Sequence, residues 1–496
     1  MNDSHAHENR YDRQELIEGW DQRRLRDAHL LIVGSGSLAT LSAMTASSLG
    51  FGHIQLIGQG AVGANARNHT SDTTQADFSD GPLHYHAQPM TSKVDAAADI
   101  CRRINAEVQI TPVRLDLRLP GNWTAAHADV IIDATNDPAT KLQAADYAMA
   151  HRIPLISAST TREQGRLALV PPDRRRAERL GDNWLHPDLA GTQQGDTTSM
   201  LMAALAVEEA RKTIMPLAGE RTLEDLVVYN NASSRLFTYE SDARGTGAER
   251  PNGYHVMQIG AGSLGNFTGI GFAMSGIHTL TIIDDDTIEE TNLNRQPMLY
   301  GDVGRHKTDS LIEKLRLINP RIQYEGIRQR VGPAFEAYIA AHKPDVIVDT
   351  VDNNPTRALL NYFSTKYSIP LVSGGTRYNS GQVVVSIPGK TACLDCKVDI
   401  DKMALESYTP QTCILAPQPS VITSNQIIGA IAVDQTRKVL NPSVFGEPSN
   451  GIVKYISAES MRLGMLPATS TCGCYKDEAR MGGWMKKMKK LYEARR

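Results

Sequence analysis

An internal repeat constrains the fold of this chain more than any other feature of its sequence. The segment HLLIVGSGSLATLSAMTASSLG, which begins at His29, returns as HVMQIGAGSLGNFTGIGFAMSG, which begins at His255. Gly34 therefore corresponds to Gly260, 226 residues later, and the same offset relates the later segments AALAVEEARK and GAIAVDQTRK. The 496 residues are too many for one core. We therefore predict two copies of one domain.

Each copy alternates predicted strands and helices. Both copies open with a short β-rich run, a glycine turn and a helical stretch. In the second copy the predicted strands cover residues 280–284, 345–349 and 369–374, and an amphipathic helix starts at Lys307. This alternation predicts the α/β class, with two tandem Rossmann-like domains that form a pseudo-dimer, each with a mostly parallel sheet flanked by helices.

The repeat also sets the expected domain boundaries. Residues 1–240 form the first copy and residues 254–465 the second. Between them, the stretch SDARGTGAERPNG at 241–253 has the glycine, proline and charge content of a linker. Residues 466–496 remain as a separate C-terminal segment with a basic tail.

Composition excludes several classes of function. A formal net charge of −3 argues against a nucleic-acid surface built on bulk positive charge. The N-terminus is polar, and no apolar run reaches the roughly 18 residues of a membrane span. We therefore expect a cytoplasmic protein with no nucleic-acid partner and no membrane span.

A glycine turn in the second copy has the spacing of a phosphate-binding loop. Gly260, Gly262 and Gly265 form the pattern G-x-G-x-x-G, which lets backbone amides and a helix N-terminus approach a phosphate. Asp284 ends the following predicted strand, where an acid commonly binds ribose hydroxyls. Many nucleotide-binding folds share these features, so they do not exclude NAD.

Polar and charged residues further along the second copy favour ATP over NAD. They are Asn292, Arg295 and Gln296 in NLNRQ, then Lys307, then Asp352. The two cations can neutralise the charge that builds on a leaving pyrophosphate, and the carboxylate can hold Mg²⁺. A hydride-transfer site has no use for this group.

Taken in order, these segments resemble the adenylation domain of the ubiquitin-activating-enzyme superfamily, which includes the ThiF and MoeB adenylyltransferases. GAGSLG, IIDDDTIEETNLNRQ, GRHKTDS, DTVDNNPTR and the cysteines follow one another as in that family, over residues 10–475. The chain has no room for the inserted catalytic-cysteine domain or the ubiquitin-fold domain of large eukaryotic activators. Its compact tandem layout is most similar to the activating enzymes of bacterial ubiquitin-like conjugation operons of the antiviral Bil and Bub type.

The resemblance implies ATP and Mg²⁺ as cofactors. Asp284 would hold the ATP ribose and Asp352 the Mg²⁺, and Arg295 and Lys307 would act in catalysis. The implied nucleotide-binding residues are Gly260, Gly262, Gly265, Asp284, Asp286, Asn292, Arg295, Gln296, Lys307 and Asp352. A cluster of surface ion pairs on a degenerate fold is the alternative.

The first copy lacks several of these groups. Three aspartates and one arginine of the second copy are replaced in the first copy, whereas two other residues are retained. The replacements are Gly58, Gly60, His69 and Asn136, and the retained residues are Asp133 and Lys93. We therefore expect catalysis in the second copy only.

The first copy nevertheless opens with RYDRQ at Arg10, which the second copy lacks. In the resembling family, the second arginine of such a segment crosses from one half to the ATP phosphates bound by the other. Arg13 is therefore predicted to complete the catalytic site of the second copy, with the electrostatic logic of an arginine finger. The alternative is a solvated N-terminal charge.

Five of the six cysteines lie beyond residue 392. Cys393 and Cys396 form C-x-x-C, and Cys472 and Cys474 form C-x-C. Four thiolates fit a closed, structural Zn²⁺ site that would pin the C-terminal segment to the second copy. The resembling family usually has C-x-x-C in both places, so free or redox-active thiols stay the alternative.

Cys413 lies outside these pairs, just ahead of a helix predicted to begin near Val421. In the resembling family, a cysteine in this loop takes the acyl group from the adenylate. Cys413 is therefore implied to be a catalytic nucleophile, since a thiolate attacks an acyl-adenylate readily, with a buried small hydrophobe as the alternative. Cys101 shares a helical face with Ile100 and Ile104, which predicts core packing.

The sequence thus predicts an enzyme that adenylates the C-terminus of a ubiquitin-like β-grasp protein with ATP. The acyl group would pass to Cys413 and then to a conjugating-enzyme-like partner. A sulfur-carrier or peptide adenylyltransferase is the alternative enzyme, and a non-catalytic scaffold the alternative outside enzymes. Pairing of two chains into a homodimer stays open. In the tail, Trp484, Met488 and Leu491 lie near one helical face, which predicts a solvated terminal helix or a docking element.

Overall fold

The computed structural model describes most of the chain. The described residues are 9–62, 84, 90–172, 184–186, 189, 192, 194–231, 233–237, 253–275, 277–407, 418–457, 462–466 and 471–493. The predicted linker at 241–253, except for Gly253, lies outside these residues, as do His69 and Cys413.

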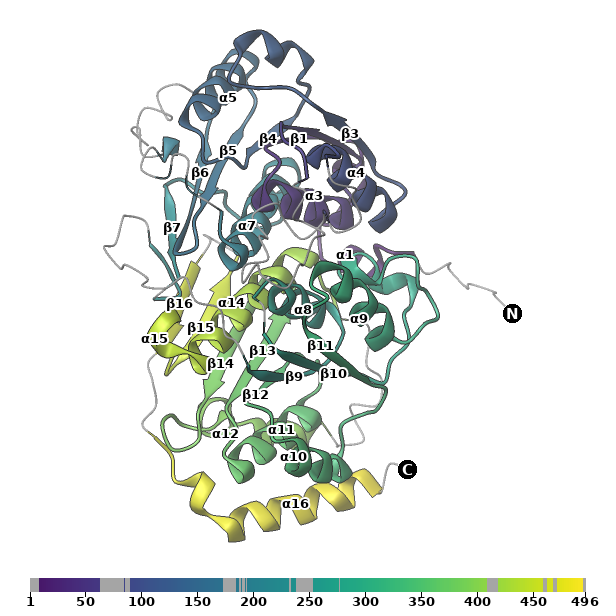
Figure 1. Ribbon diagram of the computed structural model, residues 1–496, viewed down its shortest axis with the longest axis vertical. Coiled ribbons are helices and arrows are strands. Elements are labelled where there is room, and N and C mark those ends of the chain that lie inside the picture. Colours follow the sequence, from purple (N-terminus) through teal and green to yellow (C-terminus); the bar gives the residue numbers. More distant parts are fainter. Residues whose placement is uncertain are drawn as a thin grey trace.

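Each copy of the repeat forms one eight-stranded sheet (Figure 1). The strand order is β3-β2-β1-β4-β5-β6-β7-β8 in the first sheet and β11-β10-β9-β12-β13-β14-β15-β16 in the second. In both orders the first five strands pair in parallel and the last three continue in antiparallel pairs. This topology confirms the predicted fold class of two α/β domains with mostly parallel sheets.

The strands occupy equivalent places in the two copies. In the first copy they are β1 (His29–Val33), β2 (His53–Ile57), β3 (Gln109–Val113), β4 (Val130–Asp133), β5 (Leu155–Thr160), β6 (Gln164–Val170), β7 (Val227–Asn230) and β8 (Arg235–Phe237). In the second they are β9 (His255–Ile259), β10 (Thr279–Ile283), β11 (Gln323–Ile327), β12 (Val346–Asp349), β13 (Leu371–Arg377), β14 (Ser380–Ser386), β15 (Ile452–Ile456) and β16 (Arg462–Leu466).

The α-helices follow the same plan, with additions at both ends of the chain. The first copy contains α1 (Asp12–Glu15), α2 (Gln22–Arg26), α3 (Ser37–Leu49), α4 (Lys93–Ile104), α5 (Pro138–His151) and α7 (Asp196–Ile214). The second contains α8 (Ser263–Ser275), α9 (Lys307–Ile318), α10 (Glu336–His342), α11 (Asn354–Tyr367), α12 (Leu394–Val398), α13 (Ile400–Glu406), α14 (Ile422–Leu440), α15 (Pro442–Phe445) and α16 (Glu478–Glu493).

The strands predicted in the second copy are found as β10, β12 and β13, and the predicted helix at Lys307 is α9. Only β13 runs well beyond its predicted end, to Arg377. It is extended by an antiparallel hairpin in which Arg377 pairs with Ser380 of β14. The prediction ended too early because GGT carries no apolar strand signal, whereas hairpin pairing keeps these residues extended.

The central strands are buried on both faces, as parallel strands between two layers of helices must be. Strand β1 is HLLIV and its equivalent β9 is HVMQI, and in each only the first residue is partly exposed. The helices that follow β4 and β12 also start alike, because Asp137 and Asn353 cap them by accepting a hydrogen bond from the backbone N–H of Thr140 and Thr356, both at 2.9 Å.

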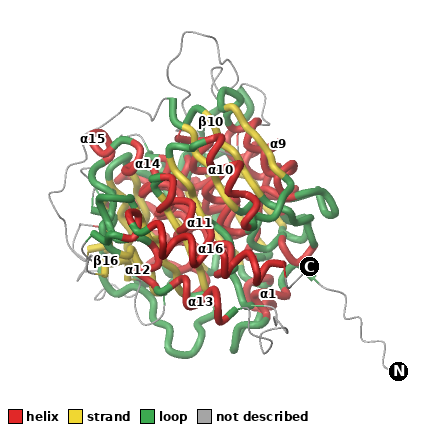
Figure 2. Tube along the Cα trace, turned by 90° about the horizontal axis from the view of Figure 1, so that it is seen from below, coloured by secondary structure: helices red, strands yellow, loops and turns green. Residues whose placement is uncertain are grey.

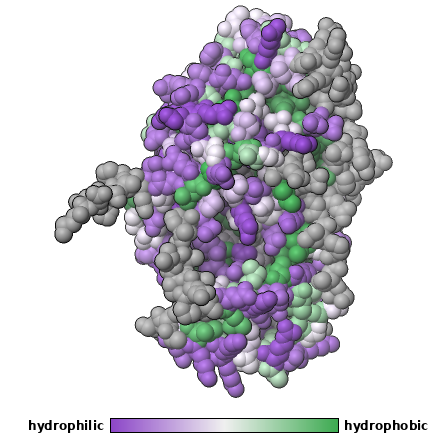
Figure 3. All heavy atoms as spheres, turned by 180° about the vertical axis from the view of Figure 1, so that it is seen from behind, coloured by the Kyte–Doolittle hydropathy of each residue, from purple (hydrophilic) through white to green (hydrophobic). Residues whose placement is uncertain are grey.

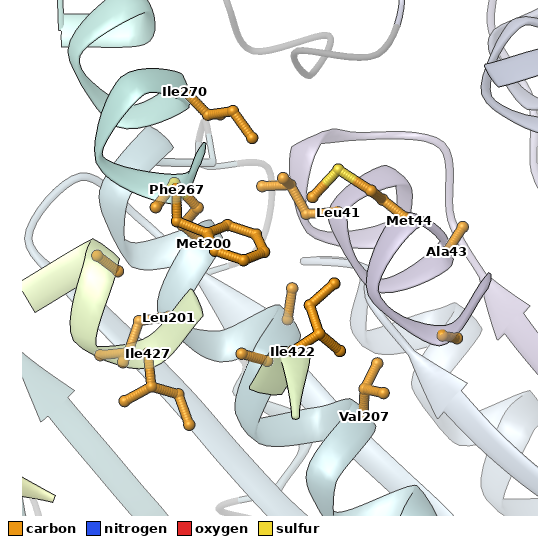
Figure 4. Close-up of a cluster of buried hydrophobic side chains, with 14 of the residues drawn as sticks. Leu41, Ala43, Met44, Met200, Leu201, Val207, Phe267, Ile270, Ile422 and Ile427 are labelled. Carbon is orange, nitrogen blue, oxygen red and sulfur yellow. The ribbon is translucent and has the colours of Figure 1, made fainter. Parts of the chain in front are cut away.

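The two copies share one hydrophobic core. Helices α3 and α7 of the first copy pack against α8 and α14 of the second, and their apolar side chains interdigitate (Figure 4). Residues such as Leu41, Met200, Phe267 and Ile427 are fully buried there. The copies therefore form a pseudo-dimer whose interface resembles the interior of a single domain.

Buried lysines link the copies near the pseudo-symmetry axis. Lys212 donates to the carbonyl oxygen of Ser457 at 3.1 Å, and its equivalent Lys438 donates to the carbonyl oxygen of Asn231. Each lysine is paired with an acid of its own helix and reaches the opposite copy. Because both charges are buried, separating the copies would leave them without these partners.

Helix α16 lies across α11 on the outer face of the second copy (Figure 2). Met485 and Met488 are buried, and Trp484 stacks on Tyr362 with 5.8 Å between ring centroids. The predicted apolar face of the tail thus packs on its own chain, while the lysines at 486, 487, 489 and 490 are exposed. No described helix is long and apolar enough to cross a membrane. Seen from behind, hydrophilic residues cover much of the described surface (Figure 3).

Candidate active site

The glycine turn between β9 and α8 has two kinds of glycine. A Cβ atom on Gly260 would lie 2.6 Å from Thr350 Oγ1, and one on Gly265 would lie 2.3 Å from the Gly260 carbonyl oxygen, so packing requires both glycines. Among the described residues, a Cβ on Gly262 would meet no atom within 4 Å. Gly262 therefore leaves open space at the N-terminus of α8, where backbone N–H groups and the helix dipole suit a phosphate.

Asp284 directly follows β10 beside this turn. Its Oδ2 accepts a hydrogen bond from the Ala261 backbone N–H at 2.7 Å, and its Oδ1 accepts one from the Asp286 N–H at 2.9 Å. Burial raises the pKa of this carboxyl, and the positive charge of Lys307 opposes that rise. The backbone thus fixes the carboxylate next to the turn, where the sequence predicts contact with ribose.

Lys307 is the first residue of α9, and Asp286 lies opposite it. The Lys307 Nζ is 2.7 Å from Asp286 Oδ2, and the Lys307 backbone N–H donates to the Asp286 carbonyl oxygen at 3.0 Å. Lys307 is almost buried, whereas the Asp286 side chain is 62% exposed. Two residues predicted to bind the nucleotide therefore form an ion pair that a phosphate could exchange with at little cost.

Within NLNRQ, Asn292 and Gln296 differ in their use of side-chain atoms. Asn292 Oδ1 accepts a hydrogen bond from the Glu289 N–H at 3.1 Å and so helps to shape the loop. Gln296 is buried, and its Oε1 has no hydrogen-bond partner among the described residues. A buried polar atom without a partner is costly unless a ligand or water binds it.

Arg295 is the central cation of the site. It is buried, and its Nη1 donates to the Thr291 carbonyl oxygen at 2.5 Å and to Asn294 Oδ1 at 2.9 Å. Burial and, second, the positive charge of Arg13 lower its pKa to about 10, while the negative charge of Asp352 opposes them. The guanidinium stays charged at neutral pH. Within the described part of the chain, its Nε and Nη2 donate no hydrogen bond.

Arg13 comes from the first copy but belongs to the surroundings of this second-copy site. Its charge acts on Arg295, and its carbonyl oxygen accepts a hydrogen bond from the Ser420 N–H at 3.0 Å. The described residues offer its guanidinium no hydrogen bond or ion pair. The charges of two arginines from different copies thus act on one another at this site, although Asp352 and Glu289 act on Arg295 in the opposite sense. Two neighbouring cations favour an anionic ligand.

Asp352 and Asp349 follow β12 and play different parts. Asp349 is fully buried, accepts a hydrogen bond from Ser373 Oγ at 2.5 Å and lies 3.4 Å from Arg357 Nε, so it serves the fold. Asp352 is exposed and its charge reaches Arg295. Carboxylate oxygens are ligands that Mg²⁺ prefers, and Asp352 is placed to supply one.

In the first copy a side chain fills the equivalent turn. The Gln194 Oε1 accepts a hydrogen bond from the Leu38 N–H at 3.0 Å, at the N-terminus of α3, and its Nε2 donates to the Ala134 carbonyl oxygen at 2.9 Å. A Cβ on Gly36, the equivalent of Gly262, would lie 2.5 Å from Gln194 Oε1. The space left open in the second copy is therefore occupied by protein in the first.

The four paired cysteines come together although 76 residues separate the two pairs. Their Sγ atoms lie within 4.8 Å of one another, and those of Cys396 and Cys474 are 3.6 Å apart. Tetrahedral Zn²⁺ with bonds of about 2.3 Å would place such atoms about 3.8 Å apart. Arg480 of α16 donates to Cys474 Sγ at 3.3 Å, so the residues fit a structural zinc site that holds α16.

Cys101 is fully buried on the core face of α4 with Ile100 and Ile104, as predicted.

Comparison with known proteins identifies the family. The profile of the ThiF family matches residues 11–246 and 243–475, which together cover both copies. The chain belongs to the ThiF family. This confirms the resemblance to the wider superfamily of activating enzymes.

Named relatives of this ThiF protein are similar over parts of their length. The SAMP-activating enzyme E1 of Haloferax volcanii is 30% identical over 220 residues, 44% of this chain and 78% of the relative. Adenylyltransferase and sulfurtransferase uba4 of Aspergillus clavatus is 37% identical over 26% of both chains. tRNA threonylcarbamoyladenosine dehydratase of Haemophilus influenzae is 34% identical over 28% of this chain and 52% of the relative.

The structure of the two ThiF domains adds site residues that the sequence reasoning missed. Arg357 holds Asp349, and Lys141 holds the equivalent Asp133 at 3.1 Å. The repeat itself carried this signal, because a cation stands at the same place in both copies. Asn294 lies inside the NLNRQ motif, but the motif does not show which partner it meets, and nothing in the local sequence of Gln194 marks it as a site residue.

Proposed function

We propose that this ThiF protein uses MgATP to adenylate the C-terminal carboxylate of a ubiquitin-like protein. The observation that carries the proposal is the meeting of Arg295 with Arg13 of the other copy beside an open glycine turn. A hydride-transfer site would gain nothing from two neighbouring arginines, whereas a triphosphate carries negative charge that both can neutralise.

In the proposed reaction, a carboxylate oxygen of the carrier protein attacks the α-phosphorus of ATP. The bond between this phosphorus and the bridging oxygen of pyrophosphate breaks, and pyrophosphate leaves. Arg13, Arg295 and Lys307 neutralise the charge that develops on it, and Asp284 holds the ribose. Mg²⁺, bound through Asp352, would add positive charge at the phosphates.

The second step would transfer the acyl group to Cys413. Its thiolate attacks the acyl carbon of the adenylate, a thioester forms and AMP leaves. Ser420, seven residues after Cys413 in the sequence, donates its backbone N–H to the Arg13 carbonyl oxygen at 3.0 Å, which supports a place for Cys413 near this site. A conjugating-enzyme-like protein would then accept the acyl group on its own cysteine. The name of the Haloferax relative, an activating enzyme E1, supports this course.

A sulfur-carrier adenylyltransferase is the second candidate, because one relative is named an adenylyltransferase and sulfurtransferase. In that case the adenylate would be converted to a thiocarboxylate. The tandem layout favours ubiquitin-like conjugation of the bacterial operon type, in which no sulfurtransferase domain is needed.

Labelled pyrophosphate exchange into ATP tests the adenylation step, with a ubiquitin-like β-grasp protein as the carrier. Lys307→Ala should lower the exchange rate at least about a hundredfold, because the transition state loses a buried cation. The matched control is Lys93→Ala in the first copy, which should exchange at the wild-type rate. Equal losses in both variants, or no exchange with any carrier, would contradict the proposal.

A non-reducing gel separates the two candidates. Wild-type enzyme with ATP and carrier should form an adduct that a reductant removes, and Cys413→Ala should form none while it keeps pyrophosphate exchange. An adduct that persists in Cys413→Ala would show that another group accepts the acyl chain.

A further inference from the structure

The N-terminal arm, residues 10–14, bridges the two copies. Arg10 donates to Asn105 Oδ1 at 2.7 Å in the first copy and to the Leu293 carbonyl oxygen at 3.2 Å in the second. Gln14 and Asn294, both fully buried, connect the same two regions through their side chains. The arm therefore meets NLNRQ of the second copy immediately beside Arg13.

Gln14 and Asn294 form a continuous line of hydrogen bonds that runs from Arg295 to the first copy. Arg295 Nη1 donates to Asn294 Oδ1 at 2.9 Å, and Asn294 Nδ2 donates to Gln14 Oε1 at 3.0 Å. Gln14 Nε2 then donates to the carbonyl oxygen of Leu49, the last residue of α3, at 2.9 Å.

The orientation of both amides in this relay is forced by its ends. Arg295 can only donate, so the Asn294 oxygen must face it, and the Leu49 carbonyl can only accept, so the Gln14 nitrogen must face that oxygen. The remaining amide atoms, a donor on Asn294 and an acceptor on Gln14, then complement each other.

The equivalent region of the second copy shows how the asparagine at this position is bonded where no N-terminal arm is present. Asn319 is the equivalent of Asn105, and it donates to the Ala273 carbonyl oxygen at 2.9 Å within its own copy. Its Oδ1 accepts only a local backbone hydrogen bond, from the Arg321 N–H at 3.1 Å. The link between copies through an N-terminal arm thus exists once, at the site that keeps its acids.

We propose that Asn294 is a positioning residue, which joins Arg295 to Gln14 so that Arg13 and Arg295 are held together for the phosphates beyond the α-phosphate. The inference rests on the proposed ATP site. Asn294 itself touches no reacting atom, but it would hold the cations of the two copies in fixed relative positions. The first copy would thereby become part of the nucleotide site.

Loss of the hydrogen-bond relay should weaken the binding of MgATP but not the binding of AMP. AMP can use Asp284 and the glycine turn, whereas the two arginines lie where the leaving pyrophosphate would be. A variant that loosens both arginines therefore weakens MgATP binding selectively, while a general loss of structure weakens both ligands. The ratio of the affinities for MgATP and AMP therefore distinguishes a loss of arginine positioning from a general loss of folded structure.

Isothermal titration with MgATP and with AMP tests this in the full-length protein. Asn294→Leu, close in volume but apolar, and Gln14→Met in the other copy should each raise the Kd for MgATP at least about tenfold and change the Kd for AMP by less than about twofold. Since the two residues act as one relay, the double variant should be no worse than either single one.

Asn319→Leu is the matched control, because it removes a buried asparagine of the second copy that joins two elements away from the arm. It should leave the ratio of the two affinities unchanged. An unchanged ratio in Asn294→Leu and Gln14→Met would overturn the inference, as would an equal loss for both ligands. If Asn294→Leu does not fold, the affinity ratio measured for Gln14→Met tests the inference by itself. Wild-type protein that binds AMP and MgATP equally would refute the proposed function itself, and this inference with it.

Discussion

At the scale of single residues, the site is marked by two arginines from different copies whose charges act on one another. Arg295 is buried next to the charge of Arg13, and its pKa is lowered accordingly. Elsewhere in the described chain, buried cations such as Lys141 and Arg211 are paired with acids. Repulsion between like charges opposes folding, and an anionic ligand would relieve it, which supports the proposed ATP site.

Arg13→Ala should reduce pyrophosphate exchange at least about tenfold, equivalent to about 1.4 kcal/mol of transition-state stabilisation for one charge-assisted contact. Arg23→Ala, which removes an exposed arginine from the same end of the first copy, is the control. Exchange assays at saturating ATP and carrier measure the difference. An unchanged rate in Arg13→Ala would show that this arginine is a solvated charge.

At the scale of elements, two equivalent turns have diverged. Strand, glycine turn and helix are retained in both copies, but the turn before α8 opens to a ligand while Gln194 fills the one before α3. The first copy thus differs in two ways, since it lacks the equivalents of Asp284 and Asp352 and since Gln194 occupies its turn. Its helices are kept because they form half of the shared core.

Gly262→Ala should keep the melting temperature of the wild type, because its Cβ meets no atom of the described residues. The same methyl group would occupy the space of a phosphate, so we expect MgATP affinity to fall at least about tenfold. Gly36→Ala in the first copy is the control and should bind MgATP as the wild type does. Titration calorimetry and thermal melting measure both quantities, and normal affinity in Gly262→Ala would argue against phosphate binding at this turn.

The position of helix α16 depends on the cluster of four cysteines. Arg480 links the helix to Cys474 and, at 2.9 Å, to Asp395, so the beginning of α16 is attached to the cysteine cluster rather than to the sheet. If the cluster holds zinc, metal binding and docking of α16 are coupled.

Removal of zinc with a chelator should therefore raise hydrogen exchange in α16 selectively and leave α8 and α14 protected. Elemental analysis should find one zinc per chain, and Cys396→Ser should lose it and show the same exchange pattern. Protein purified without zinc, with α16 equally protected, would show that the thiols serve another purpose.

At the scale of the whole molecule, polar residues buried between the copies make the pseudo-dimer depend on pH. Glu208 of α7 accepts hydrogen bonds from Thr423 at 2.8 Å and Ser457 at 3.0 Å, both in the second copy. Burial alone would raise its pKa, but the charges of Arg211 and Lys212 and the Thr423 hydroxyl outweigh burial and lower the pKa from 4.5 to about 2.

A carboxyl whose pKa is lowered by folding stabilises the protein above its unfolded pKa and loses this effect as the pH falls through its folded pKa. Glu208→Gln should therefore lower the free energy of unfolding at neutral pH, by an amount on the order of 3 kcal/mol, and this difference from wild type should shrink between about pH 5 and about pH 2. Denaturant titrations across this range measure it. Asp99→Asn, which breaks an exposed ion pair with Arg102, is the control. A difference that is constant with pH would contradict the role of Glu208.

Much of this architecture was predictable, because its signals are local or repeated. The apolar run HLLIV predicts a buried strand by its composition, and the 226-residue offset predicts a second copy of everything that follows. The replacement of acids by Gly58 and Gly60 is equally readable once the copies are compared. The end of β13 was not, because its last residues are extended by pairing with β14 rather than by their own preference.

The sequence by itself determined that there are two α/β domains and which of them keeps the acids and cations of a nucleotide site. Only the tertiary structure decided that Gln194 fills the turn of the first copy and that Asn294 meets Gln14 from 280 residues away. The reason is physical: residue type and period are properties of a short segment, whereas a hydrogen bond between distant amides exists only after the whole chain has packed.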